Sequence, residues 1–281
     1  MFEKVLVANR GEIALRVVRA CQELGVTAVA VYSAPDEFSP HVLTAEEAVP
    51  IGPAAAAESY LDIDRLLEAA RSTGAEAIHP GYGFLAENPE FARRVEAEGL
   101  VFIGPPAAAI LAMGDKTEAR ARMTEASVPV VPGSAGPIAT SSAAREEATR
   151  LGYPILLKAA AGGGGKGMRI VESAVELERA FEAATREAGQ AFGDPRVYME
   201  RYLAAPRHIE IQVLADSAGR TIHLGERECS IQRRHQKLIE EAPSPAIDTA
   251  TRTRMGELAV AAARAVGYVG AGPVEFMYEN G

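Results

Sequence analysis

Residues 158–169 read Lys-Ala-Ala-Ala-Gly-Gly-Gly-Gly-Lys-Gly-Met-Arg and combine the residue types best suited to holding a large anion. Glycine has the highest entropic cost of ordering, so a structural role alone explains a run of four poorly. Without a Cβ, however, the backbone can bring its N–H groups directly against an anion. Lys158 and Lys166 flank the run. The segment therefore predicts a glycine-rich flap over the phosphates of a nucleoside triphosphate.

This flap does not match the common glycine motifs of nucleotide-binding proteins. A Walker loop needs Gly-x-x-x-x-Gly-Lys followed by Ser or Thr, but the required positions hold Ala160 and Gly167. A dinucleotide fingerprint follows the first strand of a βαβ unit, whereas this run lies mid-chain between expected strands at 153–158 and 167–171. A kinase also places a strand lysine beneath a hairpin, but no kinase catalytic-loop residues follow here. A flexible surface turn remains the structural alternative.

Apolar runs and amphipathic segments alternate over roughly the first 115 residues. We expect strands at 5–8, 26–32, 75–79 and 100–103, and helices at 13–24, 63–70 and 88–98. Such alternation predicts a parallel sheet with helices on its faces. Ligands of these sheets gather at the carboxyl ends of the strands. The loops at 8–12 and 79–88 are therefore candidates for ligand contact, with a rigid structural loop as the alternative reading of the second.

The second half of the chain shows a different pattern. A helix is expected to begin at Met113-Gly-Asp-Lys116 with Asp115 as its cap, and a breaker-rich linker follows at 128–137. Further on, the patterns predict helices at 174–188 and 251–266 and strands at 197–200, 208–215, 221–228 and 270–278, with a hairpin turn at 216–219. Long strands that follow one another closely favour an antiparallel sheet. The fold class is therefore α/β, becoming α+β in the C-terminal part.

Composition excludes several classes of protein. The net charge of −9 argues against a protein that embraces nucleic acid. No apolar run reaches membrane-spanning length, and no signal peptide opens the chain. Cys21 and Cys229 lie far apart without metal-type spacing, which favours a reducing, cytoplasmic setting. We therefore expect a cytoplasmic protein with no nucleic-acid or membrane partner.

Several strings, in order along the whole chain, resemble the biotin carboxylase subunits and domains of biotin-dependent carboxylases, which are ATP-grasp proteins. They are Ala8-Asn-Arg-Gly-Glu-Ile-Ala14, His79-Pro-Gly-Tyr-Gly-Phe-Leu85, Met113-Gly-Asp-Lys116, the flap after Lys158, Pro206-Arg-His-Ile-Glu-Ile-Gln212, Glu228-Cys-Ser-Ile-Gln-Arg-Arg-His-Gln-Lys237 and Glu240-Glu-Ala-Pro243. The resemblance implies a Rossmann-like N-terminal domain (1–115), a helix and linker (116–137), a flap domain (138–203) and an incomplete antiparallel-sheet domain (204–281). ATP would lie between the last two.

The resemblance also implies roles for individual residues. ATP phosphates would be held by compact ammonium groups and flap N–H groups, adenine by a hinge, and bicarbonate by a lysine. The implied nucleotide-binding residues are Lys116, Lys158, Gly164, Gly165, Glu200, Arg201, Tyr202, Leu203, His208 and His235; Lys237 would bind bicarbonate and Glu275 a metal ion. On residue types alone, Glu275 could also be a solvated position on a strand, and His208 could be a histidine at the end of a hairpin.

The implied reaction is the ATP- and bicarbonate-dependent carboxylation of biotin through carboxyphosphate. Its cofactors would be ATP and Mg²⁺ or Mn²⁺, with biotin as the carrier-bound substrate. Its partners would be a biotin carboxyl carrier protein or domain and a carboxyltransferase subunit, and the intact protein would be a homodimer. Phosphoryl transfer depends mainly on positioning and charge neutralisation, which lysines, a metal ion and a closing flap supply.

Three departures from the family pattern lead to further expectations. Pro273 stands where the family usually has threonine, close to Glu275, and proline removes a backbone donor from a strand. The family's following segment, with a second metal-binding glutamate, a base and an arginine, is absent, as is the C-terminal part that forms most of the dimer interface. We therefore expect this chain to be inactive or nearly so.

The alternatives to a biotin carboxylase are a nucleotide-binding, non-catalytic fragment and another ATP-grasp carboxylase or ligase. The fold-level alternative is a nicotinamide oxidoreductase, although the glycine fingerprint after the first strand is missing.

Overall fold

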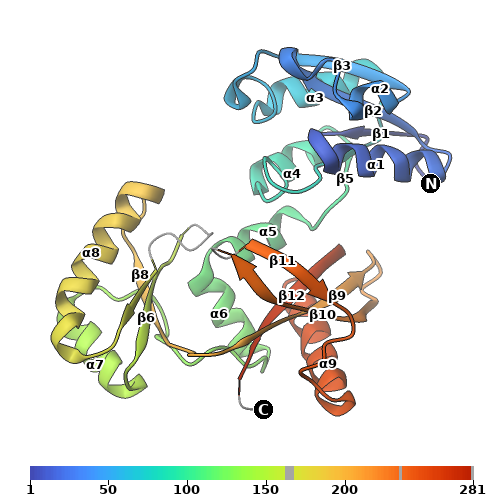
Figure 1. The fold of residues 1–281 in the computed structure, drawn as a ribbon. Coiled ribbons are helices and arrows are strands. Elements are labelled where there is room, and N and C mark those ends of the chain that lie inside the picture. Colours follow the sequence, from blue (N-terminus) through green and yellow to red (C-terminus); the bar gives the residue numbers. More distant parts are fainter. Residues whose placement is uncertain (162–167, 234–235, 280–281) are drawn as a thin grey trace. The chain divides into compact units, whose positions relative to one another are not determined.

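The computed structural model describes residues 1–161, 168–233 and 236–279. The chain divides into two compact units, Met1–Leu111 and Ala112–Gly281 (Figure 1). Each unit encloses hydrophobic clusters of its own. No helix among the described residues is both long and apolar enough to span a bilayer.

A five-stranded parallel sheet forms the centre of the first unit, in the order β3-β2-β1-β4-β5. Its strands are β1 (Lys4–Val7), β2 (Thr27–Ser33), β3 (Glu47–Gly52), β4 (Ala77–His79) and β5 (Val101–Phe102); the helices are α1 (Gly11–Glu23), α2 (Pro40–Thr44), α3 (Ile63–Thr73), α4 (Pro89–Ala97) and α5 (Ala107–Gly114), with short 3-10 turns at Ala34–Asp36 and Ala56–Glu58. Buried residues lie on both faces of the sheet, Val5 and Val7 in one hydrophobic cluster and Leu6 in another. The predicted parallel sheet is confirmed.

Two loops at the carboxyl ends of β1 and β4 are fastened to each other. Asn9 is 3% exposed, and its Nδ2 donates to the backbone oxygens of Pro80 (2.8 Å) and Tyr82 (2.7 Å). The Phe84 ring stacks on the buried Tyr60 ring with centroids 5.2 Å apart. These contacts hold the loop at 79–88 in place, as its structural reading predicts.

The first sheet of the second unit has three antiparallel strands, in the order β7-β6-β8. Two helices, α7 and α8, pack together and contribute to the same hydrophobic cluster as these strands. The elements here are α6 (Lys116–Glu125), α7 (Ser141–Leu151), β6 (Ile155–Ala159), β7 (Arg169–Val171), α8 (Ala174–Phe192) and β8 (Val197–Arg201). The predicted strands on both sides of the glycine run pair antiparallel as β6 and β7, while Gly164 and Gly165 lie outside the described residues.

The second sheet of this unit has four antiparallel strands in the order β11-β10-β9-β12, namely β11 (Gln236–Glu241), β10 (Thr221–Arg233), β9 (Arg207–Ala215) and β12 (Gly270–Tyr278). The helix α9 (Thr249–Ala265) covers one face of it. Because side chains alternate along a strand, Ile209, Ile211 and Val213 enter the core against α9 and the polar residues between them point to the opposite face.

Pro273 does not interrupt β12. This strand pairs with β9 from Gly270 to Tyr278, with Pro273 opposite Gln212. Among the described strands, β12 ends the sheet order and is paired on one side, a position in which a sheet tolerates the missing proline donor.

Candidate functional site

Glu200 is a buried carboxylate near the end of β8, only 6% exposed, and basic side chains surround it. The Nζ atom of Lys158 lies 2.5 Å from its Oε2, and Nη1 of Arg120 lies 2.7 Å from its Oε1. Arg120 also donates to the backbone oxygen of Val131 at 2.6 Å. Both carboxylate oxygens of Glu200 thus have a cationic donor.

Strand pairing and helix periodicity bring these side chains together. Leu156 pairs with Glu200 and Lys158 with Tyr198, so Lys158 and Glu200 project from the same face of the β6–β8 pair. Lys116 and Arg120 are four residues apart on α6 and therefore share one face of that helix. We call Lys116, Arg120, Lys158 and Glu200 the Glu200 cluster.

The electrostatics of the Glu200 cluster favour an anionic ligand. Burial and the neighbouring Lys158 ammonium lower the pKa of Lys116, although the Glu200 carboxylate partly offsets them. Three cations face a single carboxylate within the cluster, so its positive charge is only partly neutralised. Fixed positive charge in a partly buried site attracts polyanions such as phosphate chains.

The start of α6 is well defined. Asp115 accepts hydrogen bonds from the N–H groups of Thr117 (2.9 Å) and Glu118 (3.2 Å), as an N-cap does. The hydrogen bond from the Thr117 hydroxyl, followed by these backbone donors, lowers the pKa of Asp115 to about 2. The predicted cap is confirmed, and it fixes the position of Lys116 at the first residue of the helix.

A second group of charges lies on the face of the four-stranded sheet away from α9. The Nζ atom of Lys237 on β11 bonds to Glu210 of β9 and lies 2.6 Å from Oε1 of Glu275 on β12. The Nε2 atom of His208 lies 3.4 Å from the same Oε1 atom. Arg227 of β10 also pairs with Glu210. We call His208, Glu210, Arg227, Lys237 and Glu275 the Lys237 cluster.

Mutual neutralisation shifts the pKa values in the Lys237 cluster. The adjacent His208 and Lys237 lower the pKa of Glu275 to about 2. Burial alone would lower the pKa of Lys237, but its hydrogen bonds with Glu210 and Glu275 raise it instead. Lys237 and Glu275 are therefore charged at neutral pH, with Lys237 lying between the Glu210 and Glu275 carboxylates.

The donor set of the Lys237 cluster fits a hard divalent cation. One ligand atom from each of His208, Glu210 and Glu275 lies within 4.8 Å of the others. Carboxylate oxygens are the ligands that Mg²⁺ and Mn²⁺ prefer. Lys237 contacts both carboxylates, so a bound cation would compete with its ammonium group.

In the hinge predicted to bind adenine, two backbone N–H groups already bond to backbone oxygens of the protein. The Arg201 N–H donates to the Pro132 oxygen (2.8 Å) and the Tyr202 N–H to the Pro154 oxygen (3.1 Å). Among the residues that the structure describes, the Leu203 N–H has no acceptor. His235 lies outside these residues. The structure thus gathers Lys116, Lys158 and Glu200 in one cluster and His208, Lys237 and Glu275 in another.

Three members of the clusters were not predicted from the sequence, namely Arg120, Glu210 and Arg227. The four-residue spacing from Lys116 was a signal for Arg120. Glu210 lies two residues after His208 in an expected strand, and this spacing was a signal that the two side chains share a face. The position of Arg227 depends on strand register, which residue types alone do not specify.

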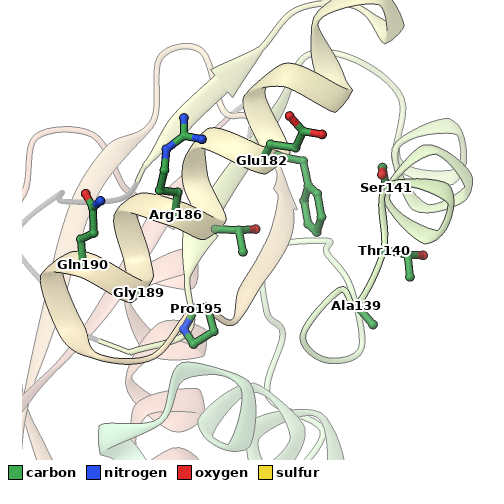
Figure 2. Close-up of a pocket in the computed structure, with 10 residues that line it drawn as sticks. Ala139, Thr140, Ser141, Glu182, Arg186, Gly189, Gln190 and Pro195 are labelled. Atoms are coloured by element: carbon green, nitrogen blue, oxygen red, sulfur yellow. The ribbon is translucent and has the colours of Figure 1, made fainter.

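A surface cavity of about 810 Å³ lies beside α8 and the start of α7, and no residue of either cluster lines it (Figure 2). Its lining comprises Ala139, Thr140, Ser141, Phe181, Glu182, Thr185, Arg186, Gly189, Gln190 and Pro195. None of these belongs to the predicted site. The charge arrangement, not this cavity, therefore locates the candidate site.

Two family models match the chain. Residues 1–110 match the model described as "Biotin carboxylase, N-terminal domain". Residues 115–281 match the model described as "Carbamoyl-phosphate synthase L chain, ATP binding domain". Together the two models cover nearly the whole chain.

Similar proteins agree with these matches. A biotin carboxylase of Allochromatium vinosum is 56% identical over 100% of this chain and 63% of its own length. The propionyl-CoA carboxylase alpha chain of Ruegeria pomeroyi is 54% identical over 100% of this chain and 41% of its own length. The chain thus spans less than two thirds of the length of these relatives.

The same likeness extends to three dimensions. The biotin carboxylase domain dimer of 2-oxoglutarate carboxylase from Hydrogenobacter thermophilus, solved with MgADP, ADP and bicarbonate, has a TM-score of 0.94 and 51% identity. The match covers 100% of this chain and 62% of that one. With both family models, close sequence relatives and this structural agreement, the chain belongs to the biotin carboxylase family of ATP-grasp proteins.

Proposed function

We propose that this chain provides the nucleotide-binding part of an enzyme that carboxylates biotin with ATP and bicarbonate. The observation that carries the proposal is the excess of positive charge in the Glu200 cluster. Lys116, Arg120 and Lys158 come from two separate elements, α6 and β6, and all lie around one carboxylate. A polyphosphate chain supplies the negative charge that this arrangement lacks.

Each predicted residue has a role in this proposal. Lys116 and Lys158 bind the phosphates, and the N–H groups of Gly164 and Gly165 serve as further donors. Adenine binds at the hinge formed by Glu200, Arg201, Tyr202 and Leu203, where the Leu203 N–H is the backbone donor that remains. His208 and His235 contact the nucleotide. Support comes from the solved relative, which was crystallised with MgADP.

Lys237 and Glu275 serve the second substrate and the metal ion. An ammonium group between two carboxylates is held in place and keeps its charge at neutral pH, as the binding of bicarbonate requires. Glu275 would hold Mg²⁺ or Mn²⁺, which neutralises phosphate charge when bound. The solved relative also contains bicarbonate.

In the proposed reaction a bicarbonate oxygen attacks the γ-phosphorus of ATP, and ADP leaves with the electrons of the broken P–O bond. The product, carboxyphosphate, breaks at its anhydride C–O bond into CO₂ and inorganic phosphate; a ureido nitrogen of biotin then forms a C–N bond to the CO₂ and gives up its proton to the released phosphate. Lys116 and Lys158 stabilise the charge on the phosphates during the transfer. Lys237 orients the bicarbonate, and a closed flap keeps water from the anhydride.

The partners of the proposed enzyme follow from this chemistry. Biotin must be carried to the site and away from it, which requires a biotin carboxyl carrier protein or domain and a carboxyltransferase. Homodimerisation of the intact protein is also proposed, since the solved relative is described as a domain dimer. The final acceptor of the carboxyl group depends on the transferase.

Nucleotide titrations test this function most directly. We expect the chain to bind MgADP in a calorimeter, and Lys116→Met and Lys158→Met each to weaken binding by about tenfold or more, as the loss of a charged hydrogen bond predicts. Arg220→Met is a matched control, because Arg220 is exposed and pairs with Asp216 far from the cluster in sequence. Equal affinities in all four proteins would contradict the proposal.

Turnover separates this reaction from those of other ATP-grasp enzymes. Biotin-dependent carboxylation predicts ADP formation that needs bicarbonate and rises when free biotin is added. ADP formation that ignores biotin would favour a different ligase. In the intact protein, nucleotide binding without any turnover would favour the non-catalytic alternative, whereas we propose that this chain alone turns over little or not at all.

A further inference from the structure

Each oxygen of the Glu200 carboxylate bonds to one cationic side chain. Arg120 holds Oε1 at 2.7 Å and Lys158 holds Oε2 at 2.5 Å, while the Glu200 side chain is only 8% exposed. A nucleobase amine that donates to Oε2 would lie beside the Lys158 ammonium, and an oxygen that already bonds to an ammonium is a weaker acceptor for a second donor. If the proposed function is right, the cluster both binds phosphate and contacts adenine, and both roles depend on Nζ of Lys158 and Oε2 of Glu200.

The two cationic partners of Glu200 differ in how firmly they are held. Arg120 also donates to the Val131 oxygen at 2.6 Å, and its guanidinium carbon lies 5.9 Å from the centroid of the Tyr198 ring. Lys158 carries a compact ammonium on a flexible stem, with a side chain 22% exposed. An arriving polyphosphate can therefore attract Lys158, whereas Arg120 keeps the carboxylate in place.

Moving Lys158 removes a charged donor from Oε2 of Glu200, and this loss favours a ligand that can donate a hydrogen bond to the same oxygen. A buried carboxylate oxygen that loses a charged donor is strongly destabilised unless another donor replaces it. The exocyclic amine of adenine is such a donor, and a purine without that amine offers none at the same position. The vacated Oε2 atom would thus favour an amine-bearing base.

We propose that the Lys158–Glu200 ion pair couples phosphate binding to base selection. When phosphates draw Lys158 away from Oε2 of Glu200, this oxygen becomes a stronger acceptor and discriminates more strongly in favour of the adenine amine. Adenine selectivity is therefore conditional on the phosphate chain. Because coupling between two ligands is reciprocal, the amine also strengthens the hold of Lys158 on phosphate.

A comparison of four ligands measures this coupling. Adenosine and purine riboside differ by the 6-amine alone, and their 5′-diphosphates repeat the comparison with phosphates present. For the wild-type chain we expect a preference of about tenfold or more for ADP over purine riboside diphosphate, the size of a charged hydrogen bond. The preference for adenosine over purine riboside should stay within about threefold by the same reasoning.

Variants distinguish coupling from independent contacts. In Lys158→Met the Oε2 atom is free without phosphate, so both preferences should become similar while overall ADP affinity falls. Lys116→Met is the matched control, since it also removes a phosphate-binding lysine but leaves the Lys158–Glu200 pair intact. It should weaken ADP yet keep the wild-type difference between the two preferences. Glu200→Gln should reduce the preference for the amine in both ligand pairs.

Two different failures can be told apart. If the wild-type chain binds neither diphosphate, both the proposed function and the coupling fall. If it binds ADP and the two preferences are equal, or if Lys158→Met behaves like Lys116→Met, the coupling alone is wrong. Ligand-observed NMR on each folded variant extends the measurement to the weakly bound nucleosides.

Discussion

Glu210 and Glu275 lie directly opposite each other on the neighbouring strands β9 and β12. Two carboxylates at such a position repel each other and destabilise the strand pair. Lys237 relieves the repulsion by reaching both of them from β11. The same two carboxylates and His208 form the donor set that fits a divalent cation. The ammonium of Lys237 thus occupies the place of positive charge that a metal ion would otherwise fill.

Removing this ammonium should improve metal binding. In Lys237→Met the repulsion between Glu210 and Glu275 is no longer offset, and we expect Mn²⁺ to bind about tenfold more tightly than in the wild type, since a nearby positive charge is gone. Electron paramagnetic resonance of free Mn²⁺ measures this affinity.

Lys237→Arg is the matched control, because it keeps the positive charge and should leave Mn²⁺ affinity close to that of the wild type. Glu275→Gln should weaken Mn²⁺ binding in both backgrounds. If Lys237→Met bound Mn²⁺ no more tightly than Lys237→Arg, these carboxylates would not be the metal site.

The cap of α6 predicts how stability depends on pH. The folded-state pKa of Asp115, about 2, lies below the ordinary value of 3.8. The ionised cap therefore stabilises the fold fully above about pH 4, and this contribution is lost as pH falls from 3.8 toward 2.

Asp115→Asn preserves capping by a side-chain oxygen but removes the charge. We expect the free energy of unfolding of the wild type to exceed that of Asp115→Asn at pH 7, by an amount that shrinks as the pH is lowered through this window. Urea denaturation at several pH values checks it. A difference that stays constant down to pH 2 would show that the carboxylate charge does not stabilise the cap.

Sequence periodicity predicted the elements that carry strong apolar patterns. The alternation of buried runs with amphipathic helices led to the parallel sheet, and the clean alternation at 208–215 led to β9. Two strands were not predicted. β3 contains Pro50, and β11 is charged and largely exposed, so neither carries a strong apolar signal. They form because a neighbouring strand supplies hydrogen-bond partners, as β10 does for β11.

The candidate site was predictable as a set of residues but not as a set of contacts. Lys116, Lys158 and Lys237 were identified from motifs that resemble a family. Residue types do not show that Lys158 bonds to Glu200, because that contact depends on the register of β6 against β8. A shift of one residue would turn either side chain to the other face of the sheet.

Substitutions at two neighbouring glycines can test whether the Asn9 side chain holds the 79–88 loop in place. Both have positive φ angles, +64° at Gly81 and +68° at Gly83, so alanine is strained by roughly 1 kcal/mol at either position. A Cβ on Gly81 would also lie 2.9 Å from Nδ2 of Asn9, whereas nothing lies within 4 Å of one on Gly83.

Gly81→Ala must therefore displace an amide that is buried and bonded to two backbone oxygens, which costs about 1–3 kcal/mol more. We expect Gly81→Ala to lower the free energy of unfolding of the first unit more than Gly83→Ala does, and to speed proteolysis within the loop. Chemical denaturation and limited proteolysis measure the two effects. Because the backbone strain is nearly the same in both variants, equal losses would mean that Asn9 does not hold the loop.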